Sequence, residues 1–207
     1  MIITDLKFNK KGTFDIWVDG EYICDIDDET VYKMSIRKGD EISDEFLSEI
    51  KHLSQVQGAK RAGARMLTAS MKSRYDFEIK LIQKGFEKKA VKKAADFFEE
   101  KGFLNDAAYA RSYVADAISI KKQGAAKIRM MLKSKGISAD IIDALLTDFD
   151  ESEEENLKAL VKKEFAKMPV RDKKHIDKLK RKLYSKGYGI GDIISAINDA
   201  GGEEIEE

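Results

Sequence analysis

The sequence predicts a mainly α-helical protein, built as three tandem three-helix repeats and preceded by a small N-terminal β-hairpin region. Two observations lead to this prediction. The phrase Leu-x-x-Lys-Gly plus an apolar residue occurs three times, and its glycines, Gly85, Gly136 and Gly187, stand 51 residues apart. Equal spacing of this kind is typical of stacked structural repeats. The second observation is an Asp-Gly pair between two runs of strand-forming residues near the N-terminus.

The N-terminal hairpin follows from this Asp-Gly pair. Asp19-Gly20 separates Thr13–Val18 from Glu21–Ile26, which favours a two-residue turn between antiparallel strands. Residues 2–8 would add the third strand that a stable hairpin needs. The pairs that this turn would place opposite each other are Trp17 with Tyr22 and Ile16 with Ile23. A helix capped by Ser43 and extending to about Val56 would then lead into the repeats.

Each repeat is predicted to contain three helices, nine in all, because apolar residues recur with helical spacing before and after every glycine. The first helix of each repeat is expected at about 57–71, 106–120 and 153–165. Ser152 and Glu155 have the spacing of a capping box for the last of these. We therefore divide the chain into 1–56 (hairpin region and linking helix), 57–104, 105–151 and 152–207, the last with an acidic tail.

The repeated glycines are predicted to end helices. A glycine just past the last turn adopts the left-handed conformation that satisfies the final carbonyl groups. The residue after each glycine would then contact the leucine at the start of the phrase. The preceding lysines, Lys84, Lys135 and Lys186, suit the negative end of a helix dipole.

Composition excludes several classes of protein. The 207 residues are 37% charged, with one cysteine and no apolar stretch long enough to cross a bilayer, so we expect a cytoplasmic protein without an internal disulfide framework. His52, His175 and Cys24 lie far apart in sequence, and no phosphate-binding loop occurs. We expect no catalytic residues, no metal and no cofactor.

Zero net charge conceals an uneven distribution. Residues 58–136 carry 19 Lys and Arg against 8 Asp and Glu, whereas residues 1–57 carry 7 against 13 and residues 137–207 carry 12 against 17. A basic block of this size can bind phosphates or an acidic protein surface, and the alternative is a set of solvated helix faces. The candidate binding residues in the block are Lys60, Arg61, Arg65, Lys72, Arg74, Lys121, Lys122, Lys127 and Arg129.

Three stretches of the chain resemble the bacterial regulatory protein family RecX. They are 73–86 (SRYDFEIKLIQKGF), 102–110 (GFLNDAAYA) and 124–128 (GAAKI) with Leu132 and Gly136-Ile137. The resemblance covers roughly residues 57–200, and three motifs in the right order make it specific. Arg65, Lys72 and Arg74 match basic positions of the family's first motif.

The resemblance implies a fold and a function. The family's fold is a curved, elongated array of three three-helix units. Its members are non-enzymatic regulators of the RecA recombinase that lie in the groove of the RecA filament on single-stranded DNA. They limit filament growth and promote disassembly, and so lower recombination, ATP hydrolysis and SOS induction. The competing hypothesis is a direct DNA-binding protein whose paired helices act as helix-turn-helix units.

Overall fold

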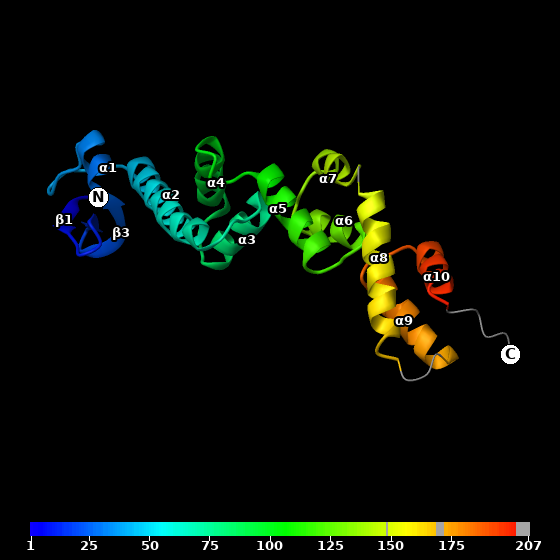
Figure 1. Ribbon diagram of the computed structural model, residues 1–207. Coiled ribbons are helices and arrows are strands. Elements are labelled where there is room, and N and C mark those ends of the chain that lie inside the picture. The colour runs from blue at the N-terminus through cyan, green and yellow to red at the C-terminus, as the bar shows by residue number, and fades with distance from the viewer. Residues whose placement is uncertain (148, 169–171, 202–207) are drawn as a thin grey trace. The chain divides into compact units, whose positions relative to one another are not determined.

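The strands and helices of the computed structural model follow one another as predicted, with a sheet first and helices after it (Figure 1). The structure describes residues 1–147, 149–168 and 172–201. The predicted class, mainly helical with a small N-terminal β region, is confirmed. Two compact units divide the chain, Met1–Leu104 and Asn105–Glu207. The finer division into four parts stays a prediction, and its acidic tail, residues 203–207, lies outside the described residues.

The N-terminal sheet is antiparallel, with strand order β1-β2-β3. Its strands are β1 (Ile3–Phe8), β2 (Thr13–Val18) and β3 (Glu21–Asp27). Asp19 and Gly20 both have positive φ, 50° and 88°, as the two-residue turn requires. Trp17 pairs with Tyr22 as predicted, but Ile16 pairs with Cys24 and the predicted pair with Ile23 is wrong. The register shifts between Ile16 and Trp17, because β3 carries one extra residue at this point.

One face of the sheet packs against helices to form the first core. Short helix α1 (Asp28–Lys33) and long helix α2 (Asp44–Ala69) follow the strands. The fully buried side chains of this core are Ile3, Ile16, Ile26 and Ile50. The Ser43 side chain accepts a hydrogen bond from the amide of Phe46 (3.2 Å), so the predicted cap begins α2. The helix then continues past Val56, and the predicted linking helix and first repeat helix are one element of 26 residues.

Helices α2, α3 (Arg74–Gln83) and α4 (Lys88–Glu100) form the first three-helix bundle. Its core is built from Phe77, Leu81, Val91 and Phe98, with the rings of Phe77 and Phe98 packed edge to face at 5.6 Å. Close packing here needs a small residue on α2. Gly63 supplies it, because an added Cβ would lie 2.6 Å from the Phe77 ring.

The described residues of the second unit form six helices. Their bounds are α5 (Asp106–Ser119), α6 (Ala125–Ser134), α7 (Ala139–Leu146), α8 (Asp150–Phe165), α9 (Lys173–Ser185) and α10 (Ile190–Asp199). Helices α5–α7 enclose one core, around Ile128 and Leu132, and α8–α10 enclose another, around Leu179 and Leu183. The predicted capping box at Ser152 is wrong. Helix α8 begins earlier, and the Ser152 hydroxyl donates to the carbonyl of Phe149 (2.9 Å).

All three repeated glycines end a helix in the left-handed conformation, with φ of 91° at Gly85, 74° at Gly136 and 96° at Gly187. The following amide donates in each case to the carbonyl of the leucine that opens the phrase. These bonds run from Phe86 to Leu81 (3.3 Å), from Ile137 to Leu132 (3.1 Å) and from Tyr188 to Leu183 (3.4 Å).

The two bundles of the second unit are joined by hydrogen bonds at the start of α6. The amide of Gly124 donates to the carbonyl of Lys186 (3.0 Å), and the Tyr188 hydroxyl donates to the carbonyl of Lys122 (3.1 Å). Gly124 provides no side-chain cap for α6. Instead, the amide of Ala125 donates to the carboxylate of Glu153 on α8 (3.0 Å). One bundle therefore caps a helix of the other.

The buried thiol of Cys24 gives the first testable prediction. Burial raises its pKa from 9.0 to about 11, which lowers the thiolate fraction at pH 8 by about 100-fold. Native protein should therefore react with an aromatic disulfide reagent about 100-fold more slowly than protein unfolded in urea. The thiolate forms at lower pH in the unfolded chain, so unit Met1–Leu104 should lose stability as the pH rises from 9 to 11. Equal labelling rates in both states would contradict this prediction.

Among the described residues, no helix combines the length and the apolar character that crossing a bilayer requires.

Candidate interaction surface

Arg74, one of the predicted binding residues, is enclosed by carboxylates. Its Nε lies 3.0 Å from Glu78 Oε1, and its two terminal nitrogens contact Asp96 and Glu99. Burial alone would lower the pKa of Arg74, but the hydrogen bond to Asp96 and the nearby carboxylates raise it. Arg74 thus joins the start of α3 to the end of α4 and stabilises the bundle. Its role in partner binding stays a prediction.

Two further predicted arginines also make internal ion pairs. Arg61 on α2 lies 2.7 Å from Asp25 on β3 and so joins the first repeat helix to the sheet. Arg129 on α6 pairs with Asp143 on α7. Sequence reasoning missed these pairs, because each carboxylate is far from its arginine along the chain.

Several predicted lysines rest on neutral groups. The ammonium of Lys60 lies 3.9 Å from the centre of the Phe97 ring, and that of Lys121 lies 5.0 Å from the Tyr113 ring. Such contacts leave the positive charge uncompensated and its outer side open to solvent. Within the described part of the chain, Lys60 and Lys121 have no carboxylate partner.

The remaining predicted lysines lie in loops between helices or in the first turn of a helix. Lys72 follows α2, and its ammonium contacts the hydroxyl and carbonyl of Ser70. Lys122 has a positive φ of 49° in the loop between α5 and α6. Lys127 lies in the first turn of α6, beside Gly187. The structure brings Lys122 and Lys127 close to one loop of unit Asn105–Glu207, at the junction of its two bundles.

Arg65 opens onto a shallow hollow between α2 and α3, which we call the basic hollow. Its lining residues are Ala62, Arg65, Met66, Lys80, Gln83 and Lys84. Arg65, Lys80 and Lys84 make no ion pair with any described residue. Lys80 and Lys84 were not among the predicted binding residues, because no sequence pattern places the end of α3 beside the middle of α2.

Four exposed lysines begin α4, directly after the turn that follows Lys84. Lys88 and Lys92, and likewise Lys89 and Lys93, are four residues apart on this helix and repel each other. Lys88 and Lys89 also lie at the positive end of the helix dipole, in a first turn that has no acidic residue. Both effects destabilise α4, so stability does not explain this arrangement. Anionic groups of a bound partner would offset both the repulsion between the lysines and their unfavourable interaction with the helix dipole.

The charges of the first bundle are separated along its length. Helices α3 and α4 are joined by a tight turn, so the end of α3 and the start of α4 share one end of the bundle. That end carries the basic hollow and the four lysines of α4. The acidic residues Asp96 and Glu99 lie at the other end, where they hold Arg74. That end therefore carries most of the cations of the bundle that have no ion-pair partner among the described residues, whereas Lys72 and Lys101 lie at the other end.

Exposed apolar side chains accompany the basic residues on α3 and α6. Ile79 is 36% exposed and Met130 is 51% exposed, and the two occupy the same position of the repeat, 51 residues apart. Tyr75, one turn before Ile79, is also exposed. An exposed apolar residue at one repeated position favours a protein partner over a purely phosphate surface. The sequence could have indicated this position through the 51-residue spacing.

Helix α9 is a further basic element that the sequence analysis missed. It carries six Lys and Arg residues against one Asp between Lys173 and Ser185, and Tyr184 near its end is 64% exposed. Over residues 137–207 as a whole, acidic residues outnumber basic ones, so the basic character of α9 does not show in the charge of this region. A count by helix would have found it.

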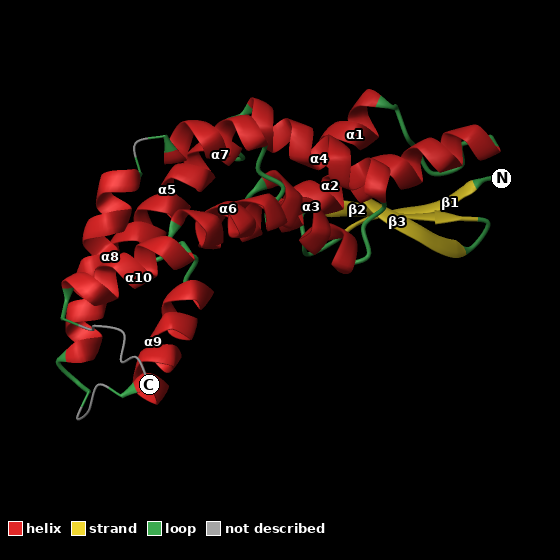
Figure 2. Ribbon diagram, turned by 90° about the vertical axis from the view of Figure 1, so that its right-hand side faces the viewer, coloured by secondary structure: helices red, strands yellow, loops and turns green. Residues whose placement is uncertain are grey.

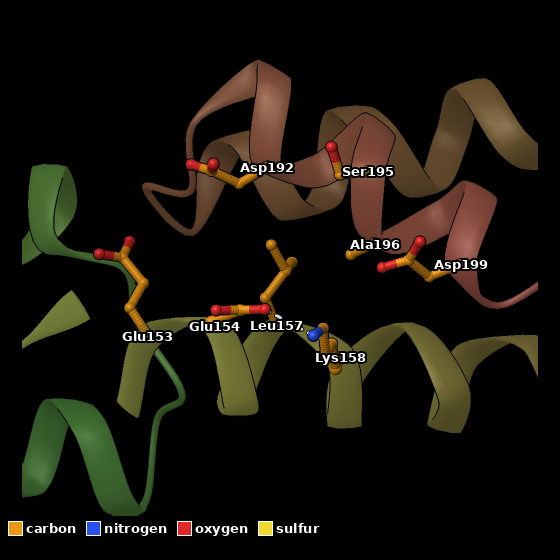
Figure 3. A pocket seen from close by; sticks show the side chains of 8 residues that line it. All are labelled: Glu153, Glu154, Leu157, Lys158, Asp192, Ser195, Ala196 and Asp199. Carbon is orange, nitrogen blue, oxygen red and sulfur yellow. Dashed lines mark hydrogen bonds and ion pairs between the residues drawn. The ribbon is translucent and has the colours of Figure 1, made fainter. Parts of the chain in front are cut away.

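A second hollow, between α8 and α10, is acidic (Figure 3). It encloses about 260 Å³, and the carboxylates of Glu153, Glu154, Asp192 and Asp199 surround its apolar floor at Leu157. Glu153 caps α6, and Glu154 forms an ion pair with Lys158 at 2.5 Å. The carboxylates of α8 thus have internal partners.

The described residues contain no cluster of His, Cys, Asp and Glu that could hold a metal ion. His52 lies on α2 in one unit and His175 on α9 in the other, and buried Cys24 belongs to the sheet. His175 has a local role, since its Nδ1 lies 2.6 Å from Asp172 at the start of α9. The fold and its surfaces define a helical-repeat protein with basic and apolar contact surfaces.

Comparison with known proteins identifies the family. Residues 105–146 match the second three-helix domain of RecX. The chain is 32% identical to Regulatory protein RecX of Clostridium botulinum (strain Alaska E43 / Type E3), over 96% of this chain and 95% of the relative. It is 34% identical to Regulatory protein RecX of Clostridium perfringens (strain SM101 / Type A), over 90% of each. The chain belongs to the RecX family of regulatory proteins.

Solved structures agree with this assignment. A crystal structure of regulatory protein RecX matches with a TM-score of 0.70 and 25% identity, over 95% of this chain and 98% of the other. RecX from Lactobacillus salivarius shares the fold, with a TM-score of 0.59 and 22% identity, over 71% of this chain and 97% of the other.

Proposed function

We propose that this protein regulates the RecA recombinase by binding the RecA filament on single-stranded DNA. In this proposal it limits filament extension, promotes disassembly and catalyses no reaction itself. It acts in the cytoplasm as a monomer and so lowers strand exchange, ATP hydrolysis and SOS induction. The observation that carries the proposal is the set of cations on α4, which repel one another, and in the basic hollow, none of which forms an ion pair with a described residue.

The chemistry of this surface supports a protein–DNA polymer as the partner. The unpaired cations attract phosphates and acidic side chains, and Ile79 and Tyr75 on α3 offer apolar contact with a protein. A tandem repeat presents the same kind of contact more than once, as exposed Ile79 and Met130 do, and a filament likewise repeats its subunits. Several weak contacts made together give high avidity without a deep pocket.

A RecA ATPase assay tests the proposal directly. Protein at well below one molecule per RecA should suppress the ATP hydrolysis that single-stranded DNA stimulates, because blocking a growing filament end affects many subunits. Turnover is followed during titration of the protein into preformed filaments and into free RecA. Bovine serum albumin at equal concentration serves as the control. Unchanged hydrolysis at an excess of the protein would refute the proposal.

Direct DNA binding is the second candidate, and α9 favours it. Lysine and arginine side chains on α9, of which Lys182 is paired with Glu164 at 2.7 Å, suit phosphate contact, and exposed Tyr184 suits base stacking. Tight binding to DNA without any recombinase, weakening steeply with salt, would support this candidate. ATPase suppression with weak DNA binding would instead support the filament regulator.

A further inference from the structure

A third hollow lies between α8 and α10, next to the acidic hollow, and we call it the apolar hollow. In Figure 2, α10 lies alongside α8. The apolar hollow has a volume of about 510 Å³, and it is lined by Phe165 on α8 and by Ala196 and Ala200 on α10. Ala200 is the residue that ends α10, so the apolar hollow lies at the end of this helix.

The internal repeat indicates which kind of side chain the apolar hollow fits. Phe98, Phe149 and Ala200 occupy the same position of the repeat, 51 residues apart. Phe98 is buried in the core of α2–α4 and Phe149 in the core of α5–α7, with exposed fractions of 6% and 3%. At this position the bundle α8–α10 has only the methyl group of Ala200. A large apolar side chain from elsewhere would therefore complete this bundle.

The end of the first bundle provides a precedent for the source of such a side chain. Gly102 ends α4 with a φ of 75°, and the amide of Leu104 then donates to the carbonyl of Phe98 (3.1 Å). The chain thus turns back, and Leu104 is buried in the core of α2–α4. Gly201 ends α10 in the same way, with a φ of 78°. Residues 202–207 lie outside the described residues, and their one apolar side chain is that of Ile205.

The charged residues of the apolar hollow suit a carboxylate on one side only. Lys158 is already paired with Glu154 at 2.5 Å. Lys162 also lines the apolar hollow, and it makes no ion pair with any described residue, Asp199 on the facing helix included. A carboxylate on the α8 side would therefore be attracted by Lys162, whereas one on the α10 side would be repelled by Asp199. In the acidic tail, residues 203–207, two glutamates precede Ile205 and two follow it.

We infer that the acidic tail binds in the apolar hollow of its own chain, with Ile205 against Phe165 and a neighbouring glutamate paired with Lys162. Burial of the isoleucine is the main contribution, and the ion pair at the surface adds less. Ile205 is five residues beyond Ala200, so the high effective concentration makes a weak contact sufficient. The inference assigns a role to a surface that the filament regulator does not use, and it does not depend on that proposal.

Methyl NMR of the full-length protein tests the inference. The δ1 methyl groups of isoleucine are labelled with ¹³C, and the signal that disappears in Ile205→Val identifies Ile205. A bound Ile205 lies beside the Phe165 ring, so its signal should be shifted upfield from the position of an exposed isoleucine. The shift should not change with protein concentration, because the contact lies within one chain. RecA is absent, so the outcome is independent of the proposed function.

Three substitutions make the test specific. Ala200→Phe should move the Ile205 signal to the exposed position, because the new ring fills the apolar hollow. Lys162→Glu should reduce the ratio of bound to free tail about threefold, since it replaces an attraction by a repulsion. Lys163→Glu is the matched control. Lys162 and Lys163 both lie in the last turn of α8, but Lys163 does not line the apolar hollow, so its change should have little effect. Circular dichroism checks that each variant is folded.

Three results would overturn the inference. The first is an Ile205 signal at the exposed position in the unmodified protein. The second is an equal change of that signal in Lys162→Glu and Lys163→Glu, which decides the case even if Ala200→Phe does not fold. The third is an upfield shift that grows with protein concentration, which would assign the apolar hollow to the tail of a second copy.

Discussion

Replacing Gly187 by alanine is expected to destabilise unit Asn105–Glu207 by about 2–5 kcal/mol. Gly187 has a φ of 96°, which costs a residue with a side chain about 1–2 kcal/mol. An added Cβ would also lie 2.9 Å from Lys127 Cα, and closer still to the backbone nitrogen and Cβ of that residue. Helix α6 would have to shift, and overpacking of this kind costs about 1–3 kcal/mol more.

Gly85→Ala provides the matched control. Gly85 ends α3 with a φ of 91°, but an added Cβ there would meet nothing within 4 Å. Only the conformational cost of about 1–2 kcal/mol remains. Urea unfolding is followed by circular dichroism for both units and by Trp17 emission for Met1–Leu104 alone. Gly187→Ala should lower the urea midpoint seen by circular dichroism and leave the Trp17 transition unchanged. Gly85→Ala should lower the urea midpoint of the Trp17 transition. Equal losses of stability for the two variants would contradict the role of the Lys127 contact.

Reversing the three charges of the basic hollow is expected to reduce inhibition of RecA by about 100-fold or more. The variant is Arg65→Glu, Lys80→Glu and Lys84→Glu. Each cation is free of internal ion pairs within the described chain. Glutamate at positions 80 and 84 would face the negative end of α3, so circular dichroism first checks that the variant is folded. The partner loses three attractions and meets three repulsions. The measurement is the protein concentration that halves RecA ATPase activity.

A control with equal net charge separates local from general effects. Lys10, Lys11 and Lys101 are exposed residues of the same unit and make no ion pair with a described residue. Their triple change to glutamate should alter inhibition much less. Similar losses in both variants would show that only total charge matters. Arg74 is unsuitable for this test, because glutamate there would add a fourth carboxylate to Glu78, Asp96 and Glu99 and destabilise the bundle.

Local features of the fold could be predicted from the sequence. Gly85, Gly136 and Gly187 end helices because the motif needs only neighbours along the chain, and Asp19-Gly20 determines its turn for the same reason. The pairing of Ile16 with Cys24 could not be predicted, since a bulge depends on how the strand packs on its core. The continuity of α2 past Val56 likewise depends on two cores that lie along one helix.

The candidate surface was harder to predict than the fold. A basic residue is recognisable in the sequence, but whether it forms an internal ion pair depends on the carboxylates that folding brings near it. Arg61 and Arg129 are paired for this reason, whereas Arg65 is not. The hollow that unites Arg65 with Lys80 and Lys84 exists only once α2 and α3 are packed. Ion pairs and surface hollows depend on the tertiary structure, so they cannot be predicted from composition alone.

The capping of α6 by Glu153 has a consequence for engineering shorter versions of the chain. A protein truncated after residue 147 would lose Phe149, which is buried in the α5–α7 core, together with the carboxylate at Ala125 and the acceptor at Lys186. Two amides at the start of a helix would be left to solvent. The bundles α5–α7 and α8–α10 are therefore expected to unfold in a single cooperative transition, and deleting α8–α10 would not leave α5–α7 intact.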